Sequence, residues 1–347
     1  MFKPQLDILA IGDVTIDAFI HIADKDAKII CPAHKKGEAH GYCELCLEFP
    51  DKVPFESMTE VAGVGNSANA AVSAARLGLR AALVTTVGND ARGQTCIDSL
   101  KENSVGTEYI HIQKNIETNY HYALWYQADR TILINHHEYD YALPHLAMPP
   151  RWIYLSSLAS NSFPYHMLIA DYLKKNPTVQ LAFQPGTFQM KLGTTKLAEL
   201  YKMTAVFIVN LEESQLILNT NDADVHLLLE GLYKLGPKIV LITDGPKGAY
   251  MYDGGHTYFM PIYPDQKLPY ERTGCGDAFA STFISALALG KSPLEALAWA
   301  PINSMSVVEY IGAQEGLLNR PALEHFLKKA PAHYKPTIYN SFLKKQS

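Results

Sequence analysis

The 347-residue chain has no hydrophobic run long enough to be a membrane span. Its longest strongly apolar stretch, residues 278–289, is too short to cross a bilayer and is typical of a buried helix. At the N-terminus, Asp7 interrupts the chain before any signal-like apolar run begins, so we expect no secretory signal. Both absences favour a cytoplasmic protein with no membrane partner.

Cysteine is also scarce. There are five cysteines, an odd number that fits reduced cytosolic thiols better than a disulfide framework. A compact chain of this size buries roughly 75% of its unfolded surface, so it needs no disulfides to be stable. We therefore expect the cysteines to be free.

An excess of positive charge is absent as well. Lys and Arg number 30 against 35 Asp and Glu, which gives a net charge of −5, and no Lys/Arg-rich run is present. Without a basic stripe to neutralise phosphates, we expect no nucleic-acid partner. Apolar residues make up 48% and charged residues 19%, the balance of a folded protein rather than a disordered one.

Short apolar runs alternate with helical patterns along most of the chain. Such runs between helices are typical of parallel strands that are covered on both faces. The sequence therefore predicts an α/β fold, with a mainly parallel sheet between helices, in one domain over residues 1–330. The expected strands are 6–11, 81–87, 152–155, 179–183, 205–209 and 239–243, and the expected helices are 67–77, 93–102, 165–175, 212–218 and 225–235.

Two stretches interrupt this alternation. Residues 17–58 lack a helical period, and residues 107–135 contain segments that alternate as strands do. Together they predict a small β lid that is built from separate segments. Residues 331–347 contain Pro331, Pro336 and several lysines, and we expect this tail to lie loosely on the surface.

The strongest chemical signal is the run Thr273-Gly274-Cys275-Gly276-Asp277, directly before the apolar helix. Thr273 is the expected N-cap, and the glycines let backbone N–H groups point outward where the helix begins. Free N–H groups at a helix start form an anion hole suited to a phosphoryl group in transfer. Asp277 is the candidate general base, although an acid in a first turn also serves simply to stabilise the helix.

A second motif, Gly63-Val64-Gly65-Asn66-Ser67-Ala68-Asn69, leads into an expected helix. The two motifs together resemble the two signatures of the ribokinase-like, or PfkB, carbohydrate kinase family. Three weaker markers of that family follow in the expected order: Asp17, the run 210–213 (Asn-Leu-Glu-Glu) and the run 243–248 (Thr-Asp-Gly-Pro-Lys-Gly). The resemblance implies a ribokinase-like three-layer α/β fold with a β lid.

The resemblance also implies roles for individual residues, each of which has an ordinary structural alternative as a cap, turn or first-turn residue. Asp277 would be the general base, and the N–H groups of Gly274, Cys275 and Gly276 would form the anion hole. The implied acceptor-binding residues are Asp17, Gly65 and Asn69; the residues that position magnesium-bound phosphates are Asn210 and Glu213; and those that line the nucleotide site are Thr243, Gly245, Gly248 and Asn303.

The implied activity is ATP- and Mg²⁺-dependent phosphorylation of a primary hydroxyl of a sugar. A nucleoside acceptor is the alternative, because an aromatic ring of the lid segment could stack on a base, although alternating aromatics also pack in ordinary strands. These aromatics are Tyr120, Tyr122, Trp125 and Tyr126. A non-catalytic sensor of nucleotide or sugar is a further alternative. Lids of this family often pair across a dimer, so a homodimer through the lid is also expected.

The sequence departs from the family pattern at four places. Val64 replaces the first glycine of a pair, and Cys275 replaces alanine in the anion hole. Gln184-Pro185-Gly186 stands where many sugar kinases have Asp-Pro-Asn. Glu271-Arg272 stands where Asp-Thr is usual, which puts in question the monovalent-cation site that some relatives build there.

The remaining candidate is a metal site in the first lid segment. Cys31-x-x-His34 and Cys43-x-x-Cys46 have ligand spacings compatible with a tetrahedral zinc site. The alternative is that these cysteines are reduced, partly buried thiols. Spacing alone leaves both open, because such pairs occur often without a metal.

Overall fold

The computed structural model describes residues 4–23, 25–31, 43–126 and 129–339. Its centre is a sheet of strands β1 (Ile8–Ile11), β6 (Ala81–Gly88), β7 (Ile110–Gln113), β10 (Trp152–Leu155), β11 (Gln180–Phe183), β12 (Thr204–Asn210), β13 (Ile239–Thr243), β14 (Ala249–Tyr252), β15 (Thr257–Met260) and β16 (Thr337–Ile338). The strand order is β16-β15-β14-β13-β12-β11-β10-β1-β6-β7. Strands from β7 to β13 are parallel to their neighbours, and β14, β15 and β16 continue the sheet antiparallel. All six strands expected from apolar runs are present.

The central strands are apolar on both faces because helices cover both faces. Leu9, Ile153 and Phe207 have no exposed surface, and they belong to one core on one side of the sheet. Neighbours in the same strands, such as Ala10 and Tyr154, belong to the core on the other side. The pattern of continuous apolar runs therefore reflects a three-layer sandwich, which confirms the α/β fold predicted from the sequence.

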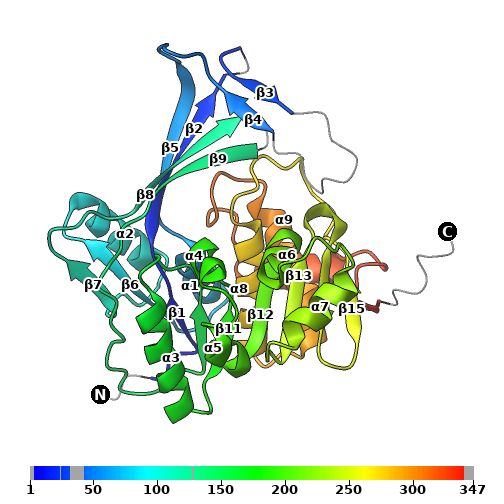
Figure 1. Cartoon of the computed structure of the whole chain (residues 1–347). Coiled ribbons are helices and arrows are strands. Elements are labelled where there is room, and N and C mark those ends of the chain that lie inside the picture. The colour runs from blue at the N-terminus through cyan, green and yellow to red at the C-terminus, as the bar shows by residue number, and fades with distance from the viewer. Residues whose placement is uncertain (1–3, 24, 32–42, 127–128, 340–347) are drawn as a thin grey trace.

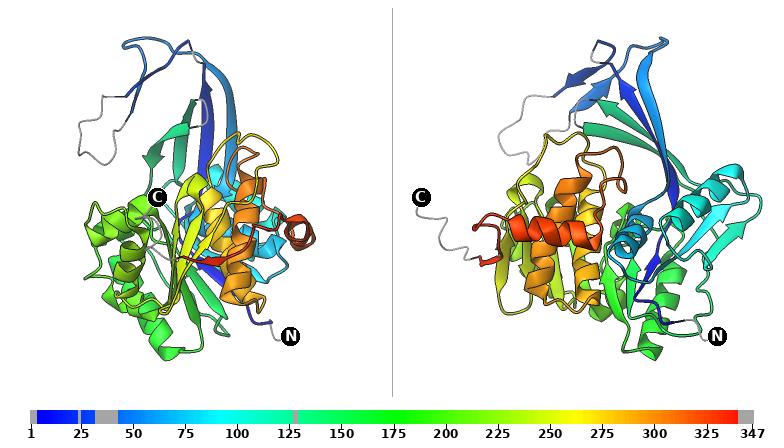
Figure 2. Two further views of the ribbon diagram at one scale, coloured as in Figure 1. Left: turned by 90° about the vertical axis from the view of Figure 1, so that its right-hand side faces the viewer. Right: turned by 180° about the vertical axis from the view of Figure 1, so that it is seen from behind.

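The helices form the two outer layers (Figure 2). One layer comprises α1 (Asn66–Arg76), α2 (Ala91–Glu102), α8 (Cys275–Ala288), α9 (Pro293–Val307) and α10 (Arg320–Lys329). The other comprises α3 (Phe163–Lys175), α4 (Thr187–Leu192), α5 (Ala198–Met203), α6 (Leu211–Leu218) and α7 (Val225–Tyr233). A 3₁₀ turn, η1 (Gly245–Lys247), follows β13. Within the described ranges, none of the helices is both long and apolar enough to cross a membrane.

A second sheet rises from the main body as a lid (Figure 1). It consists of β2 (Thr15–Ile22), β5 (Phe55–Val64), β8 (Tyr120–Tyr126) and β9 (Asp129–Asn135), in the order β5-β2-β8-β9. A separate hairpin of β3 (Lys28–Ile30) and β4 (Glu44–Cys46) lies at its outer end (Figure 1). The lid is thus assembled from separate segments, as the sequence predicts.

Two expectations about these segments need correction. Strand β7 lies inside the stretch 107–135 but pairs with β6 in the main sheet rather than with the lid. The tail is not loose up to residue 339, because β16 pairs with β15 and the buried Tyr334 hydroxyl donates to the Ala298 carbonyl at 2.7 Å. Residues 340–347 of the expected tail lie outside the described residues.

Candidate active site

Helix α8 begins at a glycine that no other residue could replace without strain. Gly274 is the N-cap, with a left-handed φ of +79°, and a Cβ placed on it would lie 2.2 Å from the Cβ of Ala313. Thr273, the N-cap expected from the sequence, instead donates from its backbone N and its Oγ1 to the Glu271 carboxylate, at 2.8 and 2.6 Å. The helix start therefore has no side-chain cap, and its first N–H groups stay available to an anion.

The space above this helix start is open. Apart from its chain neighbours and the nearby backbone of α8 itself, no described residue has an atom within 4 Å of a Cβ built on Gly276. Gly276 is also exposed, whereas Ala278 and Phe279 just beyond it are buried. The first turn of α8 thus presents its backbone outward, as an anion hole at this position requires.

Three side-chain amides hold the Asp277 carboxylate. Asn66 and Gln184 donate to Oδ1 at 2.8 and 3.1 Å, and Asn69 donates to Oδ2 at 2.8 Å. Burial raises the pKa of Asp277 above its usual range, the three amide hydrogen bonds partly offset that rise, and the negative charge of Asp17 adds to it. A carboxylate with a raised pKa is a better proton acceptor than an ordinary aspartate.

Two further side chains, Gln314 and Tyr154, orient the amides of Asn69 and Gln184. Gln314 donates from Nε2 to the Asn69 Oδ1 at 3.0 Å and to the Gly63 carbonyl at 2.8 Å. The Tyr154 hydroxyl donates to the Gln184 Oε1. Because each amide oxygen is occupied in this way, the NH₂ groups of Asn69 and Gln184 point toward Asp277.

Sequence reasoning gave no role to Asn66, Gln184, Gln314 or Tyr154. Gln184 was visible only as a departure from the family pattern, and Asn66 stood unremarked inside the Gly63–Asn69 motif. Gln314 and Tyr154 carry no local signal at all, since Gln314 contacts a residue 245 positions away.

The expected acceptor-binding residues lie around Asp277. Gly65 has a φ of +114°, and a Cβ on it would lie 2.6 Å from the Asp13 carbonyl oxygen, so the backbone approach there requires glycine. Asn69 contacts Asp277 directly. Asp17 reaches the region from lid strand β2, close enough for its charge to raise the pKa of Asp277.

The expected nucleotide residues lie at the carboxyl ends of two neighbouring strands, β12 and β13. Asn210 and Glu213 form a capping box at the start of α6, with N···O distances of 2.7 and 2.9 Å. Burial raises the pKa of Glu213, and the charge of Asp277 adds to the rise. Thr243 pairs with Asn210 in the parallel ladder, and Gly245 and Gly248 follow directly. Ligands of open α/β sheets bind at this edge.

Asn303 is not part of this group. Its side chain has no exposed surface, its Nδ2 donates to Thr282 Oγ1 at 2.8 Å, and its Oδ1 accepts from the Leu318 backbone N at 2.8 Å. Both ends of the amide are therefore used inside the helical layer, and we do not assign Asn303 to the nucleotide site.

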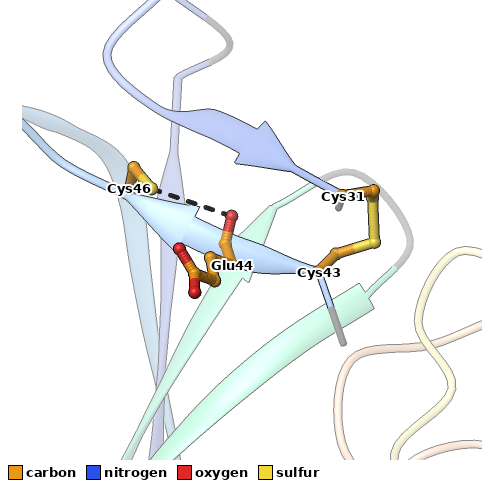
Figure 3. Close-up of a disulfide and its surroundings, with 4 residues drawn as sticks. All are labelled: Cys31, Cys43, Glu44 and Cys46. Carbon is orange, nitrogen blue, oxygen red and sulfur yellow. Dashed lines mark hydrogen bonds between the residues drawn. A yellow bond between two sulfur atoms is a disulfide. The ribbon is translucent and has the colours of Figure 1, made fainter. Parts of the chain in front are cut away.

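The zinc prediction is wrong. Cys31 and Cys43 form a disulfide (Figure 3), so neither sulfur is available as a thiolate ligand. Cys46 is free and donates to the Glu44 carbonyl at 4.0 Å, while His34 lies outside the described residues. No group of three or more potential metal ligands occurs in the part of the chain that the structure describes.

The expectation of uniformly reduced thiols is also wrong for this pair. In the β3–β4 ladder Ile30 faces Glu44, so the next position outward brings Cys31 opposite Cys43, with 4.2 Å between their Cα atoms. Cys46, Cys96 and Cys275 are free.

The lid contacts the loop before α8 at two points. Arg130 of β9 lies with its Nε 3.5 Å from Oε1 of the fully buried Glu271. The rings of Trp125 and Tyr270 meet edge to face, with centroids 5.0 Å apart. Glu271, which departs from the family pattern, thus pairs with a lid arginine.

Only part of the aromatic group expected on the lid faces the site. Trp125 alternates with Tyr120 and Tyr122 along β8, and strand geometry puts alternate residues on opposite faces. The ring centroids of Tyr120 and Tyr122 lie 4.9 Å apart, and the Tyr120 hydroxyl donates a hydrogen bond to the Glu60 carboxylate. These two tyrosines therefore lie on the face opposite Trp125, and the guanidinium of Arg92 on α2 lies over the Tyr120 ring, 4.3 Å from its centroid.

Comparison with known proteins gives a consistent result. The pattern of the "pfkB family carbohydrate kinase" matches residues 27–320. A ribokinase of Bacillus subtilis is 27% identical over 268 residues, which cover 76% of this chain and 87% of that protein. An ATP-dependent 6-phosphofructokinase of Thermoanaerobacterium thermosaccharolyticum is 24% identical and covers 72% of this chain and 80% of that protein.

Solved structures share the fold at low sequence identity. A nucleoside kinase of Methanocaldococcus jannaschii has a TM-score of 0.73 at 16% identity, covering 94% of this chain and all of that one. A ribokinase of Arabidopsis thaliana, complexed with ribose and ATP, has a TM-score of 0.72 at 20% identity, covering 94% and 99%. A putative ribokinase II of E. coli, in complex with ATP and Mg²⁺, has a TM-score of 0.67 at 18% identity, covering 93% and 99%.

The fold and the helix-start site therefore define a kinase with a ribokinase-like fold. The chain belongs to the pfkB family of carbohydrate kinases, as its two motifs predicted. Its relatives and structural neighbours are kinases, which confirms the predicted enzyme class, an ATP-dependent kinase.

Proposed function

We propose that this kinase transfers the γ-phosphoryl group of ATP to a primary hydroxyl of a sugar. The observation that carries the proposal is the placement of Asp277. Its carboxylate lies in the first turn of α8, held by three amides, next to the open backbone at Gly276. A proton acceptor and an anion-binding helix start side by side are what attack by a hydroxyl on a phosphoryl group needs.

In this proposal the roles follow from position. Asp277 takes the proton of the attacking hydroxyl, which makes the oxygen a stronger nucleophile. The N–H groups of Gly274, Cys275 and Gly276 offset the negative charge on the transferred group. Asp17, Gly65 and Asn69 hold the acceptor so that its primary hydroxyl faces Asp277.

The nucleotide would lie along the ends of β12 and β13. Asn210 and Glu213 satisfy each other in the capping box, so they would contact magnesium-bound phosphates through water. Thr243, Gly245 and Gly248 would line the wall. Apart from the chain neighbours of Gly245, no described residue has an atom within 4 Å of a Cβ built on it. Magnesium, when bound, supplies positive charge that offsets the phosphate oxygens.

A nucleoside is the second candidate acceptor. The observation that favours it is a pair of aromatic rings near the proposed acceptor-binding residues. Half-buried Phe188 on α4 meets His136 edge to face, with ring centroids 5.7 Å apart. A base could stack on Phe188 as bases do on aromatic side chains. A non-catalytic sensor is a third candidate, which the presence of Asp277 beside the helix start disfavours.

The deciding experiment measures ADP release with ATP and Mg²⁺ over a panel of free sugars and nucleosides. We expect acceptor-dependent turnover with at least one sugar and, for that acceptor, a phosphate ester at the primary hydroxyl. Turnover with nucleosides only would select the second candidate. ATP binding without acceptor-dependent turnover would select the sensor.

The outer face of the lid supports a homodimer. Met58 of β5, Tyr122 of β8 and Leu133 of β9 lie on the face of the lid opposite Trp125, and they are 49%, 40% and 52% exposed. Apolar side chains grouped on an exposed sheet face are typical of interfaces. We propose that two lids pair through this face, and light scattering after size exclusion measures the oligomeric state. A cytoplasmic location stays a prediction.

A further inference from the structure

Four side chains form a chain of contacts from the lid to the edge of the main sheet. Asp17 and His121 are direct neighbours in the β2–β8 ladder, and His121 Nδ1 lies 3.3 Å from Asp17 Oδ1. The rings of His121 and His136 stack with centroids 5.9 Å apart. His136 Nε2 lies 2.6 Å from Asp13 Oδ2. We refer to Asp17, His121, His136 and Asp13 as the His–Asp chain.

The Asp13 end of the chain is firmly fixed. Besides His136, the Tyr141 hydroxyl donates to Asp13 Oδ2 at 2.6 Å and the Ala159 backbone N donates to it at 3.0 Å. All three contacts converge on one carboxylate oxygen. The carboxylate is therefore held in one orientation, and its second oxygen is left for another partner.

Three buried atoms of the chain make no hydrogen bond among the described residues: Asp13 Oδ1, His121 Nε2 and Asp17 Oδ1, the last of which lies within ion-pair distance of His121 Nδ1, at 3.3 Å. A buried polar atom without a partner destabilises the folded state, and native proteins keep few of them. Three in one cluster, beside the residues around Asp277, indicate that ligand hydroxyl groups complete these hydrogen bonds.

The cluster is rich in negative charge. Asp13 and Asp17 belong to it, and Asp17 acts electrostatically on Asp277. The lid cation Arg130 does not balance these carboxylates, since it lies against the buried Glu271. A phosphate or carboxylate group on the acceptor would therefore meet like charge in a partly dehydrated site, where repulsion is strong.

We propose that the His–Asp chain binds the hydroxyl groups of an uncharged polyhydroxylated acceptor and disfavours phosphorylated ones. His121 contacts the acceptor through Nε2, Asp13 contacts it through Oδ1, and His136 is a positioning residue that holds the two parts of the chain together. The proposal rests on the proposed function, because it takes this region as the acceptor side of the kinase site.

The test uses the full chain and probes of both kinds. Binding of D-ribose, D-fructose, inosine and fructose 6-phosphate is measured by calorimetry, and phosphoryl transfer is measured separately by ADP release. We expect at least one uncharged probe to bind more tightly than fructose 6-phosphate. His121→Leu should weaken that binding at least about tenfold, the effect of losing one good hydrogen bond, while the KM for ATP changes less than twofold. The matched control is His111→Leu, an exposed histidine on β7, which should change neither value.

A second variant tests the charge argument. Asp17→Asn removes one carboxylate, so the ratio of fructose 6-phosphate binding to uncharged-probe binding should rise at least fivefold even if both weaken. For the positioning residue, His136→Leu should raise the acceptor KM more than it lowers kcat.

Four outcomes overturn the proposal: tighter binding of fructose 6-phosphate by the natural protein, no uncharged probe bound, unchanged binding in His121→Leu, or no change of the binding ratio in Asp17→Asn. Binding that depends on His121 but leads to no phosphoryl transfer supports the proposal and contradicts the proposed function, so the two fail separately.

Discussion

Asn69 Nδ2 donates a hydrogen bond to Asp277 Oδ2 at 2.8 Å although 208 positions separate the two residues in the sequence. Asn69 lies in α1 and Asp277 in α8. The two helices contact each other in the same layer, and small side chains such as Ala68 and Ala278 are buried in the core that they share. The two sequence motifs thus meet in one site because alanine-rich helices approach each other closely. The acceptor motif supplies the amide, and the anion-hole motif supplies the carboxylate.

The first prediction concerns Asp277 as the base. Asp277→Asn keeps the size of the side chain but cannot accept a proton, so kcat should fall at least about 100-fold, the usual scale for a general base. The KM for ATP should change little, since the expected nucleotide residues lie on β12 and β13. Steady-state kinetics with circular dichroism as the folding control measures this. Turnover near that of the natural protein would contradict the assignment.

The second prediction concerns the pKa that Asn69 helps to set. Its hydrogen bond stabilises the ionised carboxylate and lowers the pKa of Asp277, so Asn69→Ala should raise that pKa. The base works only when deprotonated. The acid limb of the kcat/KM profile should therefore lie above the ordinary aspartate range in the natural protein and move to still higher pH in the variant.

The same variant also separates two roles. If Asn69 and Asp17 hold the acceptor, alanine at either position should raise the KM for the acceptor much more than the KM for ATP. Equal effects on both substrates, together with an unmoved acid limb for Asn69→Ala, would leave these residues a purely structural role.

The third prediction concerns Arg130 and Glu271, which join the lid to the loop before α8. Arg130→Met leaves Glu271 as a buried carboxylate without its cation, which should lower the free energy of unfolding by on the order of 2 kcal/mol. Because Glu271 also accepts from Thr273, the anion hole should loosen and kcat should fall.

A double variant checks the cause of that loss. Glu271→Gln keeps an oxygen for Thr273 and removes the charge, so Arg130→Met with Glu271→Gln should be more stable than Arg130→Met alone. Urea unfolding of the four proteins gives the coupling energy directly. Additive effects of the two substitutions would show that the lid arginine and Glu271 do not act as a pair.

Local patterns in the sequence were sufficient for the parallel strands and for the residues nearest the chemistry. Apolar runs predicted β10 and β13 with their observed bounds, Trp152–Leu155 and Ile239–Thr243, because buried parallel strands have continuous apolar sequence. The glycine-flanked start of α8 predicted Asp277, since helix starts that bind anions need an open backbone.

Long-range contacts were not predictable from local patterns. Gln314 orients Asn69 and Arg130 pairs with Glu271, but an isolated glutamine or arginine carries no local signal for such contacts. Strand β7 alternates as a lid strand would, and only its pairing with β6 assigns it to the main sheet. Asn303, in turn, followed the family pattern, but helix packing buries its amide.

The prediction for the cysteines of the first lid segment failed for a related reason. Spacing within Cys31-x-x-His34 and Cys43-x-x-Cys46 suggested two ligand pairs. The ladder of β3 and β4 instead puts Cys31 opposite Cys43. Sequence spacing measures separation along one strand, but a disulfide depends on the register between two strands.

The last prediction is a thiol count on protein purified without reductant. Unfolded protein should titrate three thiols before reduction and five after it, because Cys31 and Cys43 are bonded to each other. In the folded protein Cys46 should react before Cys275, although both are partly exposed, because burial raises the pKa of Cys275. Cys96 should stay unreactive, because it is fully buried and burial raises its pKa to about 12. The Cys31→Ser, Cys43→Ser double variant should give three thiols with or without reductant, whereas five thiols in unreduced, unfolded natural protein would contradict the disulfide.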